Sequence, residues 1–85
     1  MEIEFDPAKD RANIAKHGVS LAAAKDFEIH AVVRDERRVY DEDRFNAFGV
    51  LYGRTYCLTF AVRAGKVRAI SLRRARTKEY RRHVV

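Results

Sequence analysis

An alternating segment at residues 55–63 constrains the fold more than any other feature of the sequence. Apolar and small or polar residues alternate strictly along it, so Tyr56, Leu58, Phe60 and Val62 share one side. Strict alternation of this kind indicates a β-strand with one buried face. Ala64-Gly65-Lys66 then predicts a turn into a second strand at residues 67–73. The domain is therefore expected to be built on a β-hairpin.

The register of this hairpin decides what each face of the sheet carries. A two-residue loop pairs Phe60 with Ala69 and mixes polar and apolar residues on both faces. A three-residue loop pairs Phe60 with Ile70 and Leu58 with Leu72, which matches apolar with apolar. We adopt the three-residue loop, which predicts a sheet with helices on one face. The opposite, polar face then carries Thr59, Arg63, Ser71 and Arg73.

The N-terminal segment predicts a short strand and two helices. Residues 2–5 alternate as a strand does. Asp6-Pro7 can begin a helix, since Asp6 can cap it and proline suits the first helical position. Gly18 can end that helix after Lys16-His17, and Ser20 can cap a second, shorter helix from Leu21 to about Phe27.

The remaining segments complete an α+β domain that spans residues 1–85. Residues 29–43 predict one weak strand with loops, and residues 44–52 predict a strand that ends in a tight turn at Gly53-Arg54. Residues 77–83 predict a short C-terminal helix with Thr77 as its cap. The expected fold class is thus α+β, an antiparallel β-sheet with two N-terminal helices and a short C-terminal helix.

The charge of the chain is distributed unevenly. The formal net charge is +6. Residues 1–53 hold eight Lys/Arg and eleven Asp/Glu (−3), whereas residues 54–85 hold ten Lys/Arg and only Glu79 as an acid (+9). Lys and Arg that neutralise phosphates release condensed counterions, and Arg offers a planar fork that suits phosphate. The distribution favours a nucleic-acid partner over a surface that only aids solubility or faces an acidic protein.

Composition excludes several classes of protein. No apolar run approaches the roughly 20 residues of a membrane helix, and the acidic N-terminus does not resemble a signal peptide. The single Cys57 excludes an internal disulfide and an all-cysteine metal site. The acidic run Asp41-Glu42-Asp43 is interpreted as a solvated turn, because consecutive carboxylates point in different directions. We therefore expect a cytoplasmic domain without metal or cofactor.

Three stretches of the chain resemble one protein family. They are FDPAKDRANIAKHGVSLAAA at residues 5–24, DEDRFNAFG at 41–49 and RAISLRRARTKEYRR at 68–82. Their order and spacing are similar to those of the BrnT family of bacterial type II toxins. The resemblance implies a RelE-like fold and a ribonuclease activity that blocks translation. It also implies neutralisation by an antitoxin, typically BrnA with a ribbon-helix-helix part, through which the pair binds operator DNA.

A metal-free ribonuclease that uses the ribose 2′-hydroxyl as nucleophile needs a base, an acid and cations for the developing phosphorane charge. His17, Glu79, Tyr80 and the less favoured His83 are the residues that could transfer protons. Arg63, Arg68, Arg73 and Arg74 supply cations. We name His17, Arg63, Arg73, Arg74 and Glu79 as candidate catalytic residues, and Lys16, Arg44, Arg68 and Tyr80 as candidate RNA-binding residues.

Each of these side chains also has an ordinary structural interpretation. His17 lies in the last turn of its helix, where it would interact favourably with the helix dipole. Glu79 could pair with Lys78 or Arg82, and Tyr80 could pack in the core. Arg73 and Arg74 would point to opposite faces of a strand; the register favours Arg73 at the substrate, with Arg74 available to anchor the C-terminal helix.

Two other functions use the same surface. A non-catalytic nucleic-acid-binding module would present the same Arg-rich face, and an interaction domain would dock an acidic partner there. Arg44, which follows the acidic run, could be held by those carboxylates or could bind phosphate. The resemblance favours the nuclease over both alternatives.

Overall fold

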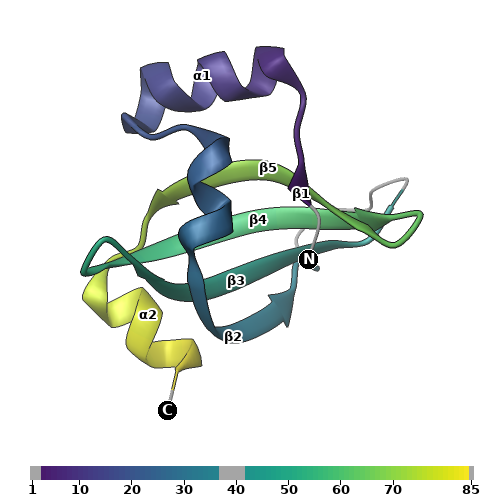
Figure 1. The fold of residues 1–85 in the computed structure, drawn as a ribbon. Coiled ribbons are helices and arrows are strands. Elements are labelled where there is room, and N and C mark those ends of the chain that lie inside the picture. Colours follow the sequence, from purple (N-terminus) through teal and green to yellow (C-terminus); the bar gives the residue numbers. More distant parts are fainter. Residues whose placement is uncertain (1–2, 37–41, 85) are drawn as a thin grey trace.

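The computed structural model describes residues 3–36 and 42–84 and has an α+β fold. Its elements are β1 (Ile3–Glu4), α1 (Pro7–His17), the 3₁₀-helix η1 (Leu21–Asp26), β2 (Glu28–Arg34), β3 (Arg44–Leu51), β4 (Arg54–Arg63), β5 (Lys66–Arg74) and α2 (Thr77–His83). The strands form one sheet in the order β1-β5-β4-β3-β2 (Figure 1). The predicted α+β class is confirmed.

The sheet is mixed, so the expectation of a purely antiparallel sheet is wrong. β1 pairs in parallel with β5, with Ile3 opposite Val67 and Glu4 opposite Arg68. The other three strand pairs are antiparallel. A parallel pair needs a long connection between its strands, and here all the other strands separate β1 from β5 in the sequence. No local pattern in residues 2–5 could reveal that partner.

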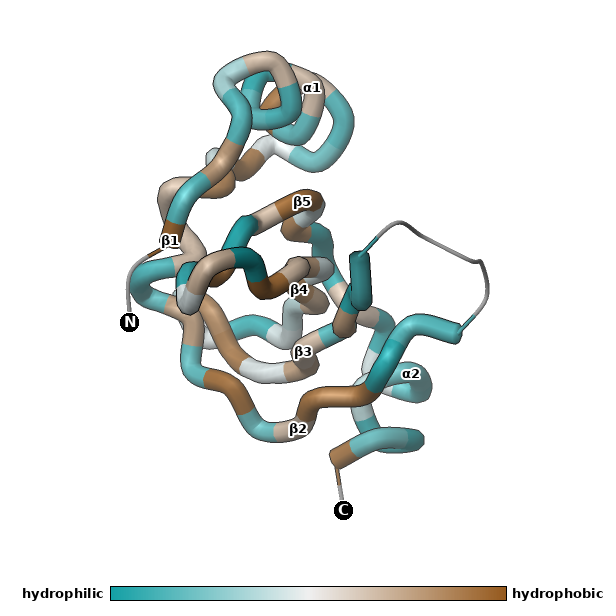
Figure 2. Tube along the Cα trace, turned by 90° about the vertical axis from the view of Figure 1, so that its right-hand side faces the viewer, coloured by the Kyte–Doolittle hydropathy of each residue, from teal (hydrophilic) through white to brown (hydrophobic). Residues whose placement is uncertain are grey.

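Helical elements cover both faces of the sheet, and each face has its own apolar cluster. η1 packs Leu21 and Ala24 against one face, where they meet Leu58 and Leu72 of the hairpin. On the opposite face, α2 packs against a smaller cluster of Phe48, Cys57 and Ala75. Figure 2 shows α2 to one side of the strands. The expectation of helices on one face only is therefore wrong, because α2 covers part of the polar face.

The predicted caps of the N-terminal helices are confirmed. Asp6 accepts a hydrogen bond from the amide of Ala8 at 2.8 Å, and Gly18 ends α1 in the left-handed conformation with φ of 73°. Ser20 caps the next helix by accepting from the amide of Ala22 at 3.1 Å. That helix is a 3₁₀-helix, which ends at Asp26 and not at Phe27.

Asn13 joins α1 to the edge of the sheet. Its side chain is buried, and its amide nitrogen donates to the carbonyl oxygens of Val19 and Leu72 at 2.8 and 2.9 Å. Its carbonyl oxygen accepts from the amide of Leu72 at 3.0 Å. β1 is too short to reach this part of β5, so the carboxamide supplies the two hydrogen bonds that a neighbouring strand would make. α1 is therefore fixed beside β5, as both figures show.

The β4–β5 hairpin combines the two registers considered for it. Next to the turn, Arg63 pairs with Lys66 and Phe60 with Ala69, as in a two-residue loop. A bulge at Ile70 then shifts the register, so that Leu58 pairs with Leu72. The predicted Leu58–Leu72 pair is confirmed and the predicted Phe60–Ile70 pair is wrong. The bulge restores the apolar match that the two-residue loop alone would lose.

Several boundaries differ from the prediction. The segment predicted as one weak strand with loops contains the seven-residue strand β2. Residues 37–41 of that segment, and Glu2 of the first predicted strand, lie outside the described residues. The turn before β4 is Tyr52-Gly53, with φ of 50° and 77°, and Arg54 already belongs to β4. Thr77 is the first residue of α2, and its N-cap is Arg76, which makes no side-chain capping bond.

A second bulge interrupts the pairing of β2 with β3. Ile29 lies opposite Gly49 and Ala31 lies opposite Phe48, which leaves His30 as the extra residue. At this point the backbone of β2 lies so close to β3 that a Cβ atom on Gly49 would overlap the carbonyl oxygen of Glu28. The absence of a side chain at Gly49 therefore permits the bulge.

We predict that Gly49→Ala destabilises the domain by about 1–3 kcal/mol, the usual cost of forcing atoms into a well-packed site. Unfolding in urea, followed by circular dichroism, measures this cost. Gly65→Asn is the control, since Gly65 has a φ of 76° with open space around it and Asn tolerates that conformation. Equal stability of Gly49→Ala and the unaltered protein would contradict the close approach.

We also predict that Asn13→Ala lowers the free energy of unfolding by about 1–3 kcal/mol, because the buried backbone groups of Leu72 lose their hydrogen-bond partners. The same denaturant experiment measures it. Arg11→Ala changes an exposed neighbour on the same helix and should stay within about 0.5 kcal/mol. An Asn13→Ala protein as stable as Arg11→Ala would show that the carboxamide does not hold α1.

Candidate active site

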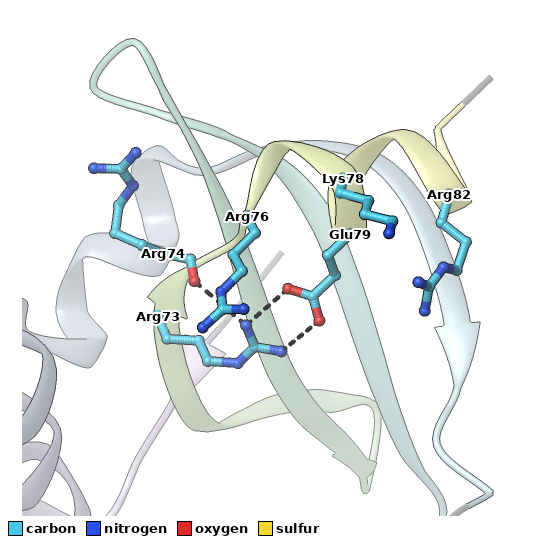
Figure 3. A pocket seen from close by; sticks show the side chains of 6 residues that line it. All are labelled: Arg73, Arg74, Arg76, Lys78, Glu79 and Arg82. Carbon is cyan, nitrogen blue, oxygen red and sulfur yellow. Dashed lines mark hydrogen bonds and ion pairs between the residues drawn. The ribbon is translucent and has the colours of Figure 1, made fainter.

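An open hollow lies where β5 ends and α2 begins. It has a volume of ≈ 390 Å³ and is lined by Arg73, Arg74, Arg76, Lys78, Glu79 and Arg82 (Figure 3). Five of these residues are cationic and one is acidic. These residues come together because the connection between β5 and α2 is short. Most of them are cationic because both elements belong to the basic half of the chain. This concentration of positive charge suits a phosphate-bearing ligand.

Arg73 and Glu79 form a two-pronged ion pair inside the hollow. Nη1 and Nη2 of Arg73 donate to the two carboxylate oxygens of Glu79 at 2.9 and 3.0 Å. Nη1 also donates to the carbonyl oxygen of Arg74 at 3.3 Å. Both side chains are about two-thirds buried, with 35% and 30% of their surface exposed. This parallel geometry is the strong form of an Arg–carboxylate contact.

The ion pair determines the protonation of Glu79. The hydrogen bonds from Arg73 lower the pKa of the Glu79 carboxyl, and they outweigh the opposing effect of its partial burial. A carboxylate whose charged form is stabilised in this way is a weak base. Glu79 therefore orients the Arg73 guanidinium. Its partner is neither Lys78 nor Arg82, the neighbours that the sequence suggested, because the end of β5 faces the first turn of α2.

Arg74 points away from this pair, as expected for consecutive strand residues. Figure 3 shows its side chain directed away from Glu79. Its guanidinium lies 5.6 Å from the ring centroid of Tyr56, and its Nε donates to the carbonyl oxygen of Thr55 at 3.3 Å. Arg74 thus contributes its backbone carbonyl to the hollow, while its charge lies over the opposite face.

His17 lies in the last turn of α1. It lines a neighbouring hollow with Lys16, Ile70 and Ser71. Desolvation lowers the pKa of the His17 imidazole, and the charges of Lys16 and Arg73 lower it further. His17 is therefore neutral near pH 7 and able to accept a proton. The structure thus joins Arg73 directly to Glu79, whereas His17 lines the neighbouring hollow and feels the charge of Arg73.

Three other candidate cations lie elsewhere. Arg63 is on the same face as Arg73, yet it lies six positions along β4 from Cys57, the partner of Arg73, which corresponds to about 20 Å. The Nε of Arg63 lies 3.4 Å from a carboxylate oxygen of Glu42. Arg68 lines a separate hollow beside Glu4, Phe5 and Asp6.

Arg44 lies opposite Ala61, at the far end of the same face as Arg63. Of the acidic run before it, Glu42 pairs with Arg63, and Asp43 accepts a hydrogen bond from Arg34 at 2.7 Å. Asp41 lies outside the described residues. Arg44, Arg63 and Arg68 therefore form a second basic region that is separate from the hollow.

Tyr80 packs in the smaller apolar cluster, which agrees with its core interpretation. Its hydroxyl lies 2.5 Å from Nδ1 of His30, and Nε2 of His30 lies 2.7 Å from a carboxylate oxygen of Glu28. The ring of His83 stacks on Phe48 at 4.6 Å. Sequence reasoning missed His30 and Glu28, because they sit in an irregular strand and meet α2 only in the folded chain.

No group of three or more His, Cys, Asp or Glu that could hold a metal ion occurs within residues 3–36 and 42–84. In the same part of the chain, no helix is long and apolar enough to cross a membrane.

Comparison with known protein families identifies the chain. Residues 5–79 match the family described as "Ribonuclease toxin, BrnT, of type II toxin-antitoxin system". The chain belongs to the BrnT family. The match includes His17 of α1 and both members of the Arg73–Glu79 pair. No match is found among curated proteins, and none among solved structures.

Membership confirms the resemblance drawn from the sequence. A BrnT protein is the ribonuclease toxin of a type II toxin–antitoxin system, and such a system implies an antitoxin partner. The hollow concentrates positive charge, and positive charge suits an RNA backbone.

We predict that His17 titrates below pH 6.5 and that its pKa rises in Lys16→Gln and in Arg73→Gln, since each removes a repelling charge. NMR titration of the imidazole measures both effects. The pKa is lower in the folded than in the unfolded chain, so the unfolded state binds more protons as the pH falls below about 6.5. The contribution of His17 to stability is thus complete above that pH and is lost on acidification through the folded pKa. An unchanged His17 pKa in Arg73→Gln would show that the two groups are not neighbours.

Proposed function

We propose that the hollow at the end of β5 is the RNA-cleaving site of a metal-independent endoribonuclease with a RelE-like fold, formed by a single domain over residues 1–85. One observation carries this proposal: the Glu79 carboxylate holds the Arg73 guanidinium in a two-pronged ion pair, within electrostatic reach of the neutral His17 imidazole. The imidazole and the guanidinium are the base and the cation that attack of a ribose 2′-hydroxyl on its own phosphate requires. Cleavage of cellular RNA in the cytoplasm then inhibits translation.

The residues divide the reaction between them. His17 accepts the proton of the 2′-hydroxyl as its oxygen bonds to phosphorus. Arg73 stabilises the additional negative charge on the phosphorane, and Glu79 keeps the guanidinium in place. The bond to the 5′-oxygen then breaks, and that oxygen takes a proton from water, which reaches the open hollow. The products are a 2′,3′-cyclic phosphate and a 5′-hydroxyl.

The other cations bind the substrate. Arg76, Lys78 and Arg82 line the hollow around the reacting phosphate. Lys16 adjoins His17, and Arg44, Arg63 and Arg68 lie farther along the sheet, where they contact neighbouring phosphates of a longer RNA. Tyr80 supports α2 from the core.

We further propose that the antitoxin is BrnA-like, with a ribbon-helix-helix part, and that it forms a hetero-oligomer with this chain. An acidic segment of the antitoxin over the hollow would neutralise its exposed cations and exclude RNA. Operator DNA is then bound only through the antitoxin. Because oppositely charged surfaces attract less at high salt, the affinity of the complex should fall as ionic strength rises.

We predict that Arg73→Ala lowers the rate of RNA cleavage by about 10²–10³, the usual effect of removing one stabiliser of transition-state charge. The assay follows end-labelled RNA in the presence of EDTA. Arg74→Ala is the matched comparison and should retain far more activity, because its guanidinium lies over Tyr56 on the opposite face.

Three outcomes of this assay separate the functions. Chelator-resistant cleavage that depends on Arg73 supports the metal-independent nuclease. RNA that is bound but intact supports a non-catalytic nucleic-acid-binding module instead. Activity that is lost in Arg74→Ala and kept in Arg73→Ala would place the site on the other face of the sheet.

A further inference from the structure

α2 carries three residues of the hollow, although its own attachment to the sheet is slight. Lys78, Glu79 and Arg82 belong to this helix. None of its residues is fully buried, and its N-cap makes no side-chain hydrogen bond. A seven-residue helix has little stability of its own, so its position depends on specific contacts with the sheet.

One of these contacts is a hydrogen-bonded chain from β2 to α2. The Tyr80 hydroxyl lies 2.5 Å from Nδ1 of His30, and Nε2 of His30 lies 2.7 Å from the Glu28 carboxylate. Ionised Glu28 can only accept, so Nε2 carries the proton; in the neutral imidazole, Nδ1 then accepts from the phenol. The rings of His30 and Tyr80 also meet edge to face, with centroids 6.0 Å apart. The side chain of His30 keeps only 29% of its surface exposed.

The backbone of β2 aims His30 at the helix. His30 is the extra residue of the β2 bulge, and a bulge redirects a side chain relative to regular pairing. The bulge exists because Gly49 lets the Glu28 carbonyl approach β3. The bulge thus depends on Gly49, and the bulge directs the His30 imidazole to the Tyr80 hydroxyl.

We propose that His30 is a positioning residue of the active site: through Tyr80 it holds α2 so that Glu79 meets Arg73. The proposal deepens the proposed function and rests on it for its catalytic meaning. Tyr80 and Glu79 are consecutive in α2, so a shift of the helix that follows loss of the Tyr80 contact also moves the Glu79 carboxylate. The two-pronged pair tolerates little displacement, since both oxygens must stay about 3 Å from one guanidinium.

The test measures the pair directly, without RNA. The pKa of Glu79 is lowered by Arg73, so carbon-13 NMR titration of its carboxyl reports whether the pair is formed. In Tyr80→Phe, which keeps the ring and removes the hydroxyl, this pKa should rise toward the ordinary glutamate value. His30→Ala should give the same rise. His30→Asn, whose carboxamide can still accept from the phenol, should give a smaller one.

Tyr52→Phe is the matched control. It removes a phenol hydroxyl that donates to Asp26 at 3.2 Å, far along the sequence from α2 and from Glu79. The Glu79 pKa should be unchanged in this variant. A general loss of stability would not separate these variants, whereas a positioning role moves the Glu79 titration in Tyr80→Phe and His30→Ala and leaves it unchanged in Tyr52→Phe.

Activity provides the second readout. A misplaced Arg73 should lower kcat about 10- to 100-fold, because a displacement of about 1 Å can cost that much in rate. KM should change little, because the hollow keeps the cations that bind the substrate. An unshifted Glu79 pKa in folded Tyr80→Phe and His30→Ala overturns the positioning role, whatever the activity. Should the unaltered protein cleave no RNA, the proposed function fails, and the Glu79 titration still decides whether His30 positions α2.

Discussion

The carboxamide of Asn13 is the contact on which the arrangement of the active site depends. It replaces a missing strand beside Leu72 and also holds the carbonyl of Val19. α1 is therefore fixed against the edge of β5, one turn of helix before His17. This contact helps to keep the imidazole beside Ser71 and within the electrostatic reach of Arg73.

The Arg73–Glu79 pair resolves an electrostatic conflict in the basic half of the chain. Like charges gathered around one hollow repel each other, and this repulsion opposes folding. The only acid of residues 54–85 lies against the most buried part of that cluster and orients one guanidinium. The remaining cations of the hollow do not pair with Glu79 and can bind phosphate. In this BrnT protein the same carboxylate thus supports both the fold and the proposed chemistry.

α2 and α1 approach the end of β5 from different directions, and each is held by a side chain that lies in another element. Asn13 fixes α1 to β5, and Tyr80 joins α2 to His30 of β2. α1 thereby supplies His17, the proposed base, and α2 supplies Glu79, which orients Arg73. The proposed site is an assembly of three elements, so changes remote from the hollow can alter it.

Local sequence determined the elements and the family. The alternation in 55–63, the caps at Asp6, Gly18 and Ser20, and the charge of the C-terminal half are readable because they depend on neighbours along the chain. The parallel β1–β5 pair, the carboxamide of Asn13, the partner of Glu79 and the His30–Tyr80 contact were decided only by the tertiary structure. Each joins residues whose approach depends on the bulges and on the packing of other elements, and such interactions leave no periodic signal in the sequence.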